Sequence, residues 1–581
     1  MCTVPGGVLA CRLAVISSLV VLTILIRVPV LMEPWGGDQG GFGYAARGIL
    51  EGRVPYRDVY DLTGYGVFFT FALFFKLFGI HMISAHIGHV IVSVVTVLLV
   101  YLVTLRALDG RAALAAGLCY TIFANGLGFS GFGYENRSAW GTYWYISQRE
   151  VFMAPLIAGA VYLSMILKSK RGWVEWPIYF SIGILVGLAV VYKLTAVLML
   201  AALSCFLGVG ELMEAKVFSA GRGRERWRCL SSVLAKQLVL VAGCVVIQLP
   251  FLYYFWIHHA LADMYKALFV HVSLYARLSR GLRIETMFSG HYSILRESLG
   301  LWLLAAVACL FILFQDRKRD NLLIAVWAVI SLVMVWGQGK FFGYHFIILV
   351  PPFAVLASYG MPKLLDLGRG MRGFLSDSVK DIRKCFIVVT LGATLVGFGI
   401  INYDYYRWHV LFVFGRISMN EYYRVFNEFP THPYSFRSDY EVVDYVRQDL
   451  RKDDRMAVVF GAGDTVIHFL LGMEDVTRFL QSWYLFPSDA TLANQPLTRL
   501  LRKEFIDQII AAAPRYILCV HMSFDDLVSL PTVKDDPEVI EFAQFVRHNY
   551  ILKRTFLDNR FLFEKRAAEE SGMTQLALKR R

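Results

Sequence analysis

Long apolar runs constrain this chain more than any other feature of its sequence. Runs of about 18–25 residues recur through the first 400 positions, and a helix of that length crosses a hydrocarbon core of ~30 Å. Charged residues make up only 18% of the 581 positions, whereas hydrophobic residues make up 57%. These runs predict a polytopic α-helical membrane protein.

Eleven runs fit a membrane crossing, and we expect about 11–13 transmembrane helices in all. The first run is too long for a secretory signal and no A-x-A cleavage site follows it, so we expect it to be retained as a helix. The spans are expected at residues 8–32, 82–105, 112–130, 150–168, 174–192, 194–211, 236–257, 298–315, 322–337, 343–361 and 385–402.

Loop charge predicts how these spans are oriented. The loops "RALDGR", "KSKRGW", "EAKVFSAGRGRERWR", "QDRKRDN" and "MPKLLDLGRGMRGFLSDSVKDIRK" are basic and all fall on one side, which the positive-inside rule assigns to the cytoplasm. The loops 33–66, 131–149 and 258–297, and everything after residue 403, then lie outside. This bias accounts for most of the net charge of +13, so nucleic acid is not expected as a partner.

The sequence divides into a transmembrane domain and a more polar C-terminal region. We expect the transmembrane domain at 1–402, an extracytoplasmic α/β domain at 403–566 and a disordered tail at 567–581. In the second domain, "RMAVVFG" and "YILCV" read as strands, and "YILKRTFLDNRFLFEKR" reads as a hairpin turning at "LDNR". The stretch "DTVIHFLLG" predicts a helix capped by Asp464 and ended by Gly472.

The first outer loop, residues 33–80, is unusually polar and rich in glycine. Its "GYAARGILEGRVPYRDVY" has a helix pattern, a glycine stop and an extended segment, and the following "VFFTFALFFKLFG" is apolar but only thirteen residues long. A run that short suits an interfacial or re-entrant helix better than a full crossing. This loop is therefore expected to do more than connect two helices.

These residues resemble the first extracytoplasmic loop of the GT-C glycosyltransferases. The similarity is to the bacterial branch related to protein O-mannosyltransferases and lipid A aminoarabinose transferases, which transfer a sugar from a polyprenyl-phosphate carrier. Three further segments look like family motifs: "SQREVFMAPLIAGAVYLSM", "GLAVVYKLTAVLML" and "GKFFGYHFIILVPPFAVLAS". One departure is "LTGYG" where relatives often have "KPP", so a lysine that could meet phosphate is absent there.

The resemblance implies a set of site residues. Asp38, flanked by glycines that let the backbone turn, is the expected general base, and Glu150 is the second catalytic candidate, as acceptor positioner or metal ligand. Basic side chains suit the donor phosphate. The phosphate candidates are Arg47, Lys193, Lys340, Arg277, Arg280 and Arg283. The substrate-binding candidates are Tyr44, Tyr56, Asp61, Tyr344 and His345.

Plainer explanations stay open for several of these residues. Asp38 could be a solvated loop residue, and Glu150 could serve only the helix dipole or an ion pair with Arg149. The arginines of loop 258–297 could contact lipid headgroups, and Asp61 could be structural. His86 and His89, spaced i,i+3 near His81, leave a divalent metal open as a cofactor, although no carboxylate stands at a fixed spacing.

The sequence therefore predicts an inverting glycosyltransferase with Asp38 as general base. The expected partners are a polyprenyl-phosphate-linked sugar, membrane lipid and a glycan, lipid or protein acceptor. The resemblance implies the bacterial inner membrane, with the C-terminal domain outside the cytoplasm. The rival interpretation is a transporter or flippase for a lipid-linked or envelope glycan intermediate, although no inverted repeat is evident.

Overall fold

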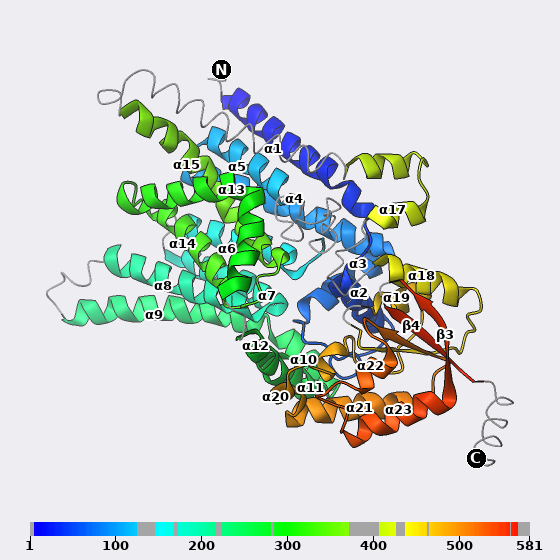
Figure 1. Ribbon diagram of the computed structural model, residues 1–581. Helices are drawn as coiled ribbons and strands as arrows, with labels where there is room; N and C mark the ends of the chain where they lie inside the picture. The colour runs from blue at the N-terminus through cyan, green and yellow to red at the C-terminus, as the bar shows by residue number, and fades with distance from the viewer. Residues whose placement is uncertain are drawn as a thin grey trace, which may run out of the picture.

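A helical bundle and a small mixed α/β region make up the chain (Figure 1). The computed structural model describes residues 5–124, 146–167, 172–214, 223–280, 284–370, 406–425, 436–461, 464–557 and 559–566. Two predictions fall outside these residues, namely the span at 385–402 and the tail at 567–581. The last turn of α8 and the first turn of α9 lie on the side of the bundle away from the C-terminal sheet (Figure 1).

Eight helical segments among the described residues are long and apolar enough to cross a membrane. Their length and composition agree with the predicted polytopic membrane protein. The elements that form these segments are α1 (Pro5–Arg27) with η1 (Pro29–Met32), α4 (Met82–Ala107), α6 (Arg149–Ile166), η5 (Gly172–Val174) with α7 (Glu175–Tyr192), η6 (Leu194–Ala196) with α8 (Val197–Glu214), α9 (Gly223–Val246) with α10 (Leu249–Ile257), α14 (Arg319–Trp336), and η8 (Gly343–Leu349) with α15 (Val350–Gly370).

Three shorter apolar helices complete the described bundle. They are α3 (Gly66–Phe78), α5 (Gly110–Phe123) and the part of α13 (Ile284–Phe314) that follows a break at Ser298. The thirteen-residue α3 agrees with the short helix predicted for the first loop.

Close backbone contact joins α7 to α9. A Cβ atom added at Gly183 would lie 1.9 Å from the carbonyl oxygen of Leu240. Small residues allow membrane helices to approach this closely, which increases van der Waals contact where lipid supplies no hydrophobic driving force. This packing fixes α7, whose last turn borders the candidate site.

Two of the loops that the sequence predicts to lie outside fold into short helices at one end of the bundle. The first loop forms α2 (Gly37–Leu50) ahead of α3. The later loop forms α11 (Leu261–Tyr265), a π-helical turn η7 (Lys266–His271) and α12 (Val272–Arg280). These elements lie between the bundle and the C-terminal region (Figure 1).

The C-terminal region contains a four-stranded sheet in the order β1-β2-β4-β3. Strands β1 (Met456–Val459) and β2 (Tyr516–Val520) are parallel, whereas β3 (Tyr550–Phe556) and β4 (Arg560–Lys565) form an antiparallel hairpin against β2. The surrounding helices are α17 (Met419–Val425), α18 (Phe436–Arg447), α19 (Val466–Leu471), η10 (Trp483–Leu485), α20 (Ala490–Ala493), α21 (Pro496–Ala512), α22 (Phe524–Val528) and α23 (Pro537–Asn549). The strands and the turn of the hairpin lie where the sequence predicted them.

The predicted cap of α19 is wrong in one respect. Gly472 does end the helix in the left-handed conformation, but Thr465 holds the N-cap position and no side chain caps the helix. Asp464 is instead fully buried and accepts a hydrogen bond from Arg560 at 3.0 Å. The buried guanidinium of Arg560 pairs with Asp439 as well as with Asp464, and this buried charge network holds the Asp464 carboxylate away from the helix end.

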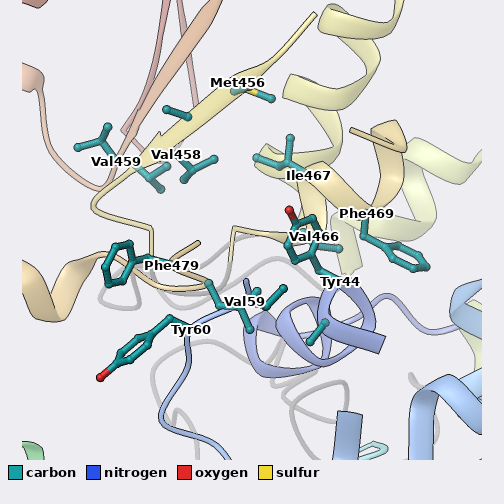
Figure 2. Close-up of a cluster of buried hydrophobic side chains, with 14 of the residues drawn as sticks. Tyr44, Val59, Tyr60, Met456, Val458, Val459, Val466, Ile467, Phe469 and Phe479 are labelled. Carbon is teal, nitrogen blue, oxygen red and sulfur yellow. The ribbon is translucent and has the colours of Figure 1, made fainter. Parts of the chain in front are cut away.

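The first loop and the C-terminal region share one hydrophobic core. Tyr44, Val59 and Tyr60 of the loop pack toward Val466 and Phe479 of the C-terminal region (Figure 2). Backbone bonds reinforce this contact, since Leu480 N donates to Tyr60 O at 3.1 Å. The loop is therefore a structural part of the interface between the bundle and the C-terminal region.

Candidate functional site

Asp38 lies in the first turn of α2 and faces the neighbouring helices. The Nε2 atom of Gln148, just before α6, donates to Asp38 Oδ2 at 3.2 Å, and Tyr344 of η8 is close enough for the charge of Asp38 to act on its hydroxyl. A carboxylate in the first turn suits the positive end of the helix dipole. The Asp38 side chain is thus held in place by a hydrogen bond and is not a free loop residue.

An ion pair between Glu150 and Lys193 lies beside Asp38. Glu150 occupies the first turn of α6, and Lys193 follows the last residue of α7 in an extended conformation. Their side chains are 2% and 13% exposed, so the pair is shielded from solvent. The Oε2 atom of Glu150 is buried and has no hydrogen-bond partner among the described residues.

Arg149 adds a second, partly buried cation, which the sequence suggested only as a mate for Glu150. Its charge acts on Glu150, Tyr344, Asp38 and Asp61 together. The signal was present in the "QRE" motif, because an arginine at the end of an apolar helix needs a partner or a wet cavity. Its position between both acids was visible only in the structure.

Lys340 approaches the same group of charges from the segment before η8. Its Nζ lies 2.8 Å from the centroid of the Tyr275 ring of α12, a cation–π contact. Burial, together with the nearby charges of Arg149 and Lys193, lowers the pKa of Lys340 to about 7, although the charge of Asp38 opposes this shift. Lys340 is therefore half-protonated near neutral pH.

Three other predicted residues border this group. His345 stacks edge-to-face on Tyr344 with ring centroids 4.6 Å apart, and it lies within reach of the charges of Lys193, Arg149 and Lys340. Asp61 is buried, and that burial raises its pKa. Tyr56 donates its hydroxyl to the Thr63 carbonyl at 2.7 Å, which closes the loop that carries Asp61.

Tyr44 and Arg47 lie apart from this cluster and point toward the C-terminal region. The Tyr44 hydroxyl accepts from Arg53 and from the Asp475 backbone, at 2.8 Å and 2.9 Å. Arg47 pairs with Glu51 and donates to the Gly472 carbonyl at 3.1 Å. Three predicted arginines cannot be placed by side chain: Arg277 and Arg280 belong to α12 with undescribed side chains, and Arg283 lies outside the described residues.

The histidines considered for a metal make structural hydrogen bonds. His86 Nε2 lies 3.0 Å from the Glu33 carbonyl oxygen, and His89 Nδ1 accepts from the Ser147 backbone at 3.0 Å. No cluster of three or more His, Cys, Asp or Glu side chains suited to a metal occurs within the described part of the chain. Lys193 occupies one oxygen of Glu150, so these residues do not fit a divalent cation as they stand.

A separate hollow of about 840 Å³ lies at the other end of the bundle. It is lined by parts of α7, α8, α9 and α14, and Lys236 there already pairs with Glu175 and Glu211 at 2.5 Å and 2.7 Å. Its rim includes Leu167 and Glu214, which border segments outside the described residues. It contains none of the predicted site residues, and we place the candidate site at Asp38.

Comparisons with known proteins agree with the resemblance drawn from the sequence. Residues 64–220 match the family model described as dolichyl-phosphate-mannose-protein mannosyltransferase, a segment that includes Glu150 and Lys193. No curated protein matches the chain in sequence.

Solved structures with a similar architecture cover nearly the whole chain. ArnT from Cupriavidus metallidurans in the apo state aligns with a TM-score of 0.53 and 13% identity, covering 94% of this chain and 97% of ArnT. ArnT bound to undecaprenyl phosphate aligns with a TM-score of 0.50 and 11% identity, covering 97% and 99%. The Archaeoglobus fulgidus oligosaccharyltransferase aligns at 0.47 and 11% identity, covering 95% and 73%.

The fold predicted from the sequence is confirmed by the two ArnT structures. At such identities the likeness to ArnT is one of fold, and the chain has the GT-C-like architecture of membrane helices followed by a small C-terminal sheet. The chain resembles the GT-C glycosyltransferases that use polyprenyl-phosphate-linked donors.

The arrangement combines a carboxylate with nearby cations at one end of the membrane bundle. Asp38 can accept a proton, while Arg149, Lys193 and Lys340 supply positive charge around it. Buried cations stabilise developing negative charge more strongly than exposed ones, since little water screens them. Such a site suits a reaction in which an anionic group departs beside a deprotonated nucleophile.

Proposed function

We propose that this chain is an inverting membrane glycosyltransferase that takes a sugar from a polyprenyl-phosphate donor. The observation that supports this most is the convergence of one held carboxylate, Asp38, with the three partly buried cations Arg149, Lys193 and Lys340. The match to the mannosyltransferase family model and the fold of ArnT, which has been crystallised with undecaprenyl phosphate, point to the same chemistry.

The proposed reaction is a single displacement at the anomeric carbon. Asp38 takes the proton from the acceptor hydroxyl or amine as that atom bonds to the anomeric carbon. The bond from the anomeric carbon to the phosphate oxygen breaks, and its electron pair leaves on the polyprenyl phosphate. Lys193, Lys340 and Arg149 stabilise that departing charge, a type of contribution that is typically worth a few kcal/mol. Inversion follows because only one displacement occurs.

Glu150 is proposed to position the acceptor. One of its oxygens is bound by Lys193, and the other is buried without a partner among the described residues. A carboxylate oxygen in that state accepts a hydrogen bond readily, because leaving it unpaired costs about 1–3 kcal/mol. We place the site on the extracytoplasmic face of a bacterial inner membrane, following the loop charges.

Turnover of a labelled donor tests this function against its rival. Purified protein in detergent is incubated with polyprenyl-phosphate sugars carrying label in the sugar, and free polyprenyl phosphate is quantified. A transferase releases polyprenyl phosphate and passes the label to an acceptor or to water. A transporter or flippase leaves the donor intact in detergent and moves it across the bilayer in proteoliposomes, and that pair of results would overturn the proposal.

A further inference from the structure

Gln148 is an unusual residue at the start of a helix. It holds the N-cap position of α6, where Ser, Thr, Asp or Asn is preferred, yet its side chain makes no capping bond. The residue is fully buried, and its Nε2 atom donates to Asp38 Oδ2 at 3.2 Å. The Gln148 side chain therefore hydrogen-bonds to the Asp38 carboxylate instead of capping α6.

The chemistry of this contact fixes which way the amide points. A carboxylate only accepts hydrogen bonds, so the nitrogen of Gln148 must face Asp38 and the oxygen must face elsewhere. That oxygen, Oε1, is buried and has no hydrogen-bond partner among the described residues. Buried polar atoms are nearly always paired, so an unpaired acceptor beside the proposed base calls for an explanation.

The backbone before Gln148 is held in a rare conformation. Ser147 has φ of +56°, a left-handed conformation that is strained for a residue with a Cβ. Its backbone N–H donates to His89 Nδ1 at 3.0 Å, and its hydroxyl donates to the Ala85 carbonyl at 3.2 Å. His86 Nδ1 lies 3.3 Å from the same hydroxyl.

Helix α2 holds the same turn from the other side. Gln39, next to Asp38, donates from Nε2 to the Ile146 carbonyl at 2.6 Å. The turn before α6 is thus tied to α4 through two histidines and to α2 through a glutamine. Strained backbone persists only where the surroundings hold it, and it is concentrated at functional sites. This bracing fixes the distance between Gln148 and Asp38.

We propose that Gln148 orients the Asp38 carboxylate and that its Oε1 accepts a hydrogen bond from the acceptor, beside the atom that Asp38 deprotonates. The inference rests on the proposed function and assigns a residue that recognises the nucleophile side of the reaction. The acceptor would therefore carry a second hydrogen-bond donor next to the reacting atom, as an amine, a vicinal diol or water does. Gln148 acts through Asp38 as a positioning residue and touches the acceptor through Oε1.

The charged surroundings of Asp38 bear on how a test is read. Titratable groups on every element packed around Asp38 act on its carboxylate. The effect of a change at Gln148 must therefore be distinguished from the effects of these groups. These groups are Asp61 in the first loop, Arg149 in α6, Lys193 after α7, and Lys340 and Tyr344 before and within η8.

Three variants test the proposal, with water as the acceptor and hydrolysis of a polyprenyl-phosphate sugar as the reaction. Gln148→Met keeps the shape but removes both contacts, and we expect kcat/KM to fall by about 10–100-fold, less than the ~10²–10⁴-fold of a positioned base, because Asp38 itself remains. Gln148→Glu places a second carboxylate beside Asp38, so the acid limb of the pH–rate profile should move to higher pH by about one unit. Gln248→Met is the matched control.

Gln248 is a partly buried glutamine of the same bundle, and its hydrogen bonds are made to residues other than Asp38. It accepts from the Tyr65 hydroxyl at 2.9 Å and donates to the Gly187 carbonyl at 2.8 Å. Its replacement should lower thermal stability and leave the pH profile in place. If Gln148→Met and Gln248→Met affect kcat/KM and the pH profile alike, Gln148 is only structural.

A second measurement does not depend on turnover. The carboxylate infrared band that is lost in Asp38→Asn can be recorded in the absence of substrate. Removing the amide donor takes a hydrogen bond away from the Asp38 carboxylate, so the frequency of that band should shift in Gln148→Met and stay unchanged in Gln248→Met. An unchanged frequency in Gln148→Met overturns the orienting role, whether or not the wild type proves to be a transferase.

Discussion

Some residues in this protein pack so closely that one added carbon atom would collide with a neighbour. Gly64 shows this most directly, because a Cβ atom there would lie 2.5 Å from the Tyr192 carbonyl oxygen. Tyr192 is the last residue of α7 and immediately precedes Lys193. The "LTGYG" segment therefore contacts the backbone that presents Lys193 to the site.

We expect Gly64→Ala to move the end of α7 and the Lys193 side chain with it. Overpacking of this kind costs about 1–3 kcal/mol, and donor binding should weaken as well. Thermal unfolding in detergent and donor affinity measure the two effects. Gly110→Ala is the control, since a Cβ at Gly110 meets nothing within 4 Å. Equal stability and affinity of the two variants would refute the close contact.

Lys340 predicts a pH dependence of donor binding. Its pKa of about 7 means that the ammonium is present below pH 7 and is lost as the pH rises through that value. Binding an anionic phosphodiester requires the charged form, so affinity should fall above pH 7 by at most about tenfold per pH unit, as expected for uptake of one proton. Titration of donor affinity between pH 6 and 9 measures this dependence.

The matched variant for this test is Lys340→Arg, which keeps its charge throughout that pH range. Its donor affinity should be flat where that of the wild type falls. The same slope in both proteins would assign the titration to another group and remove Lys340 from the phosphate contact.

Among the elements, the first loop, α11 and α21 are joined by one side chain of the C-terminal region. Arg478 donates to the Tyr56 carbonyl at 3.0 Å, to Asp263 at 3.2 Å and to Glu504 at 2.9 Å. Its guanidinium also lies 5.0 Å from the centroid of the Tyr60 ring. The Arg478 guanidinium therefore links the first loop, which carries Asp61, to α11 and to α21.

Replacing Arg478 with alanine should loosen this junction. The loss leaves Asp263 and Glu504 without their shared partner, and we expect a destabilisation of about 1–3 kcal/mol. Arg547→Ala removes an exposed ion pair with Asp525 and should cost little by comparison. Melting temperatures in detergent compare the two variants, and equal values would contradict the role of Arg478.

Over the whole molecule, the sequence predicted the bundle well and the site only in part. The length of an apolar run is enough to locate a membrane helix, because every span must cross the hydrocarbon core of the bilayer. Asp38, Glu150, Lys193 and Lys340 came from motifs and do lie together. Gln148 was missed, since its role depends on a contact between α2 and the start of α6 that has no local pattern.

The orientation of Tyr44 and Arg47 was equally hidden. Both face the C-terminal region, whose packing on the first loop involves segments more than 400 positions away in sequence. Local patterns specify helices and strands, but they do not specify which surface of a loop a distant domain will cover.

The orientation across the membrane is a prediction for the whole molecule. We expect a cysteine placed at Asp507, on α21, to react with a membrane-impermeant maleimide added to intact cells, in a background without native cysteines. A cysteine at Trp227, near the start of α9, should react only after the cells are opened, because basic loops stay cytoplasmic. The reverse pattern would invert the topology and place Asp38 on the cytoplasmic face.

The most direct test of the account compares the wild type with Asp38→Asn on a polyprenyl-phosphate sugar. Asparagine keeps the size of the side chain but cannot accept the proton, so release of polyprenyl phosphate should fall by about 10²–10⁴-fold while donor affinity is retained. An Asp38→Asn protein that turns over donor at the wild-type rate would show that Asp38 is not the base and would contradict the central claim.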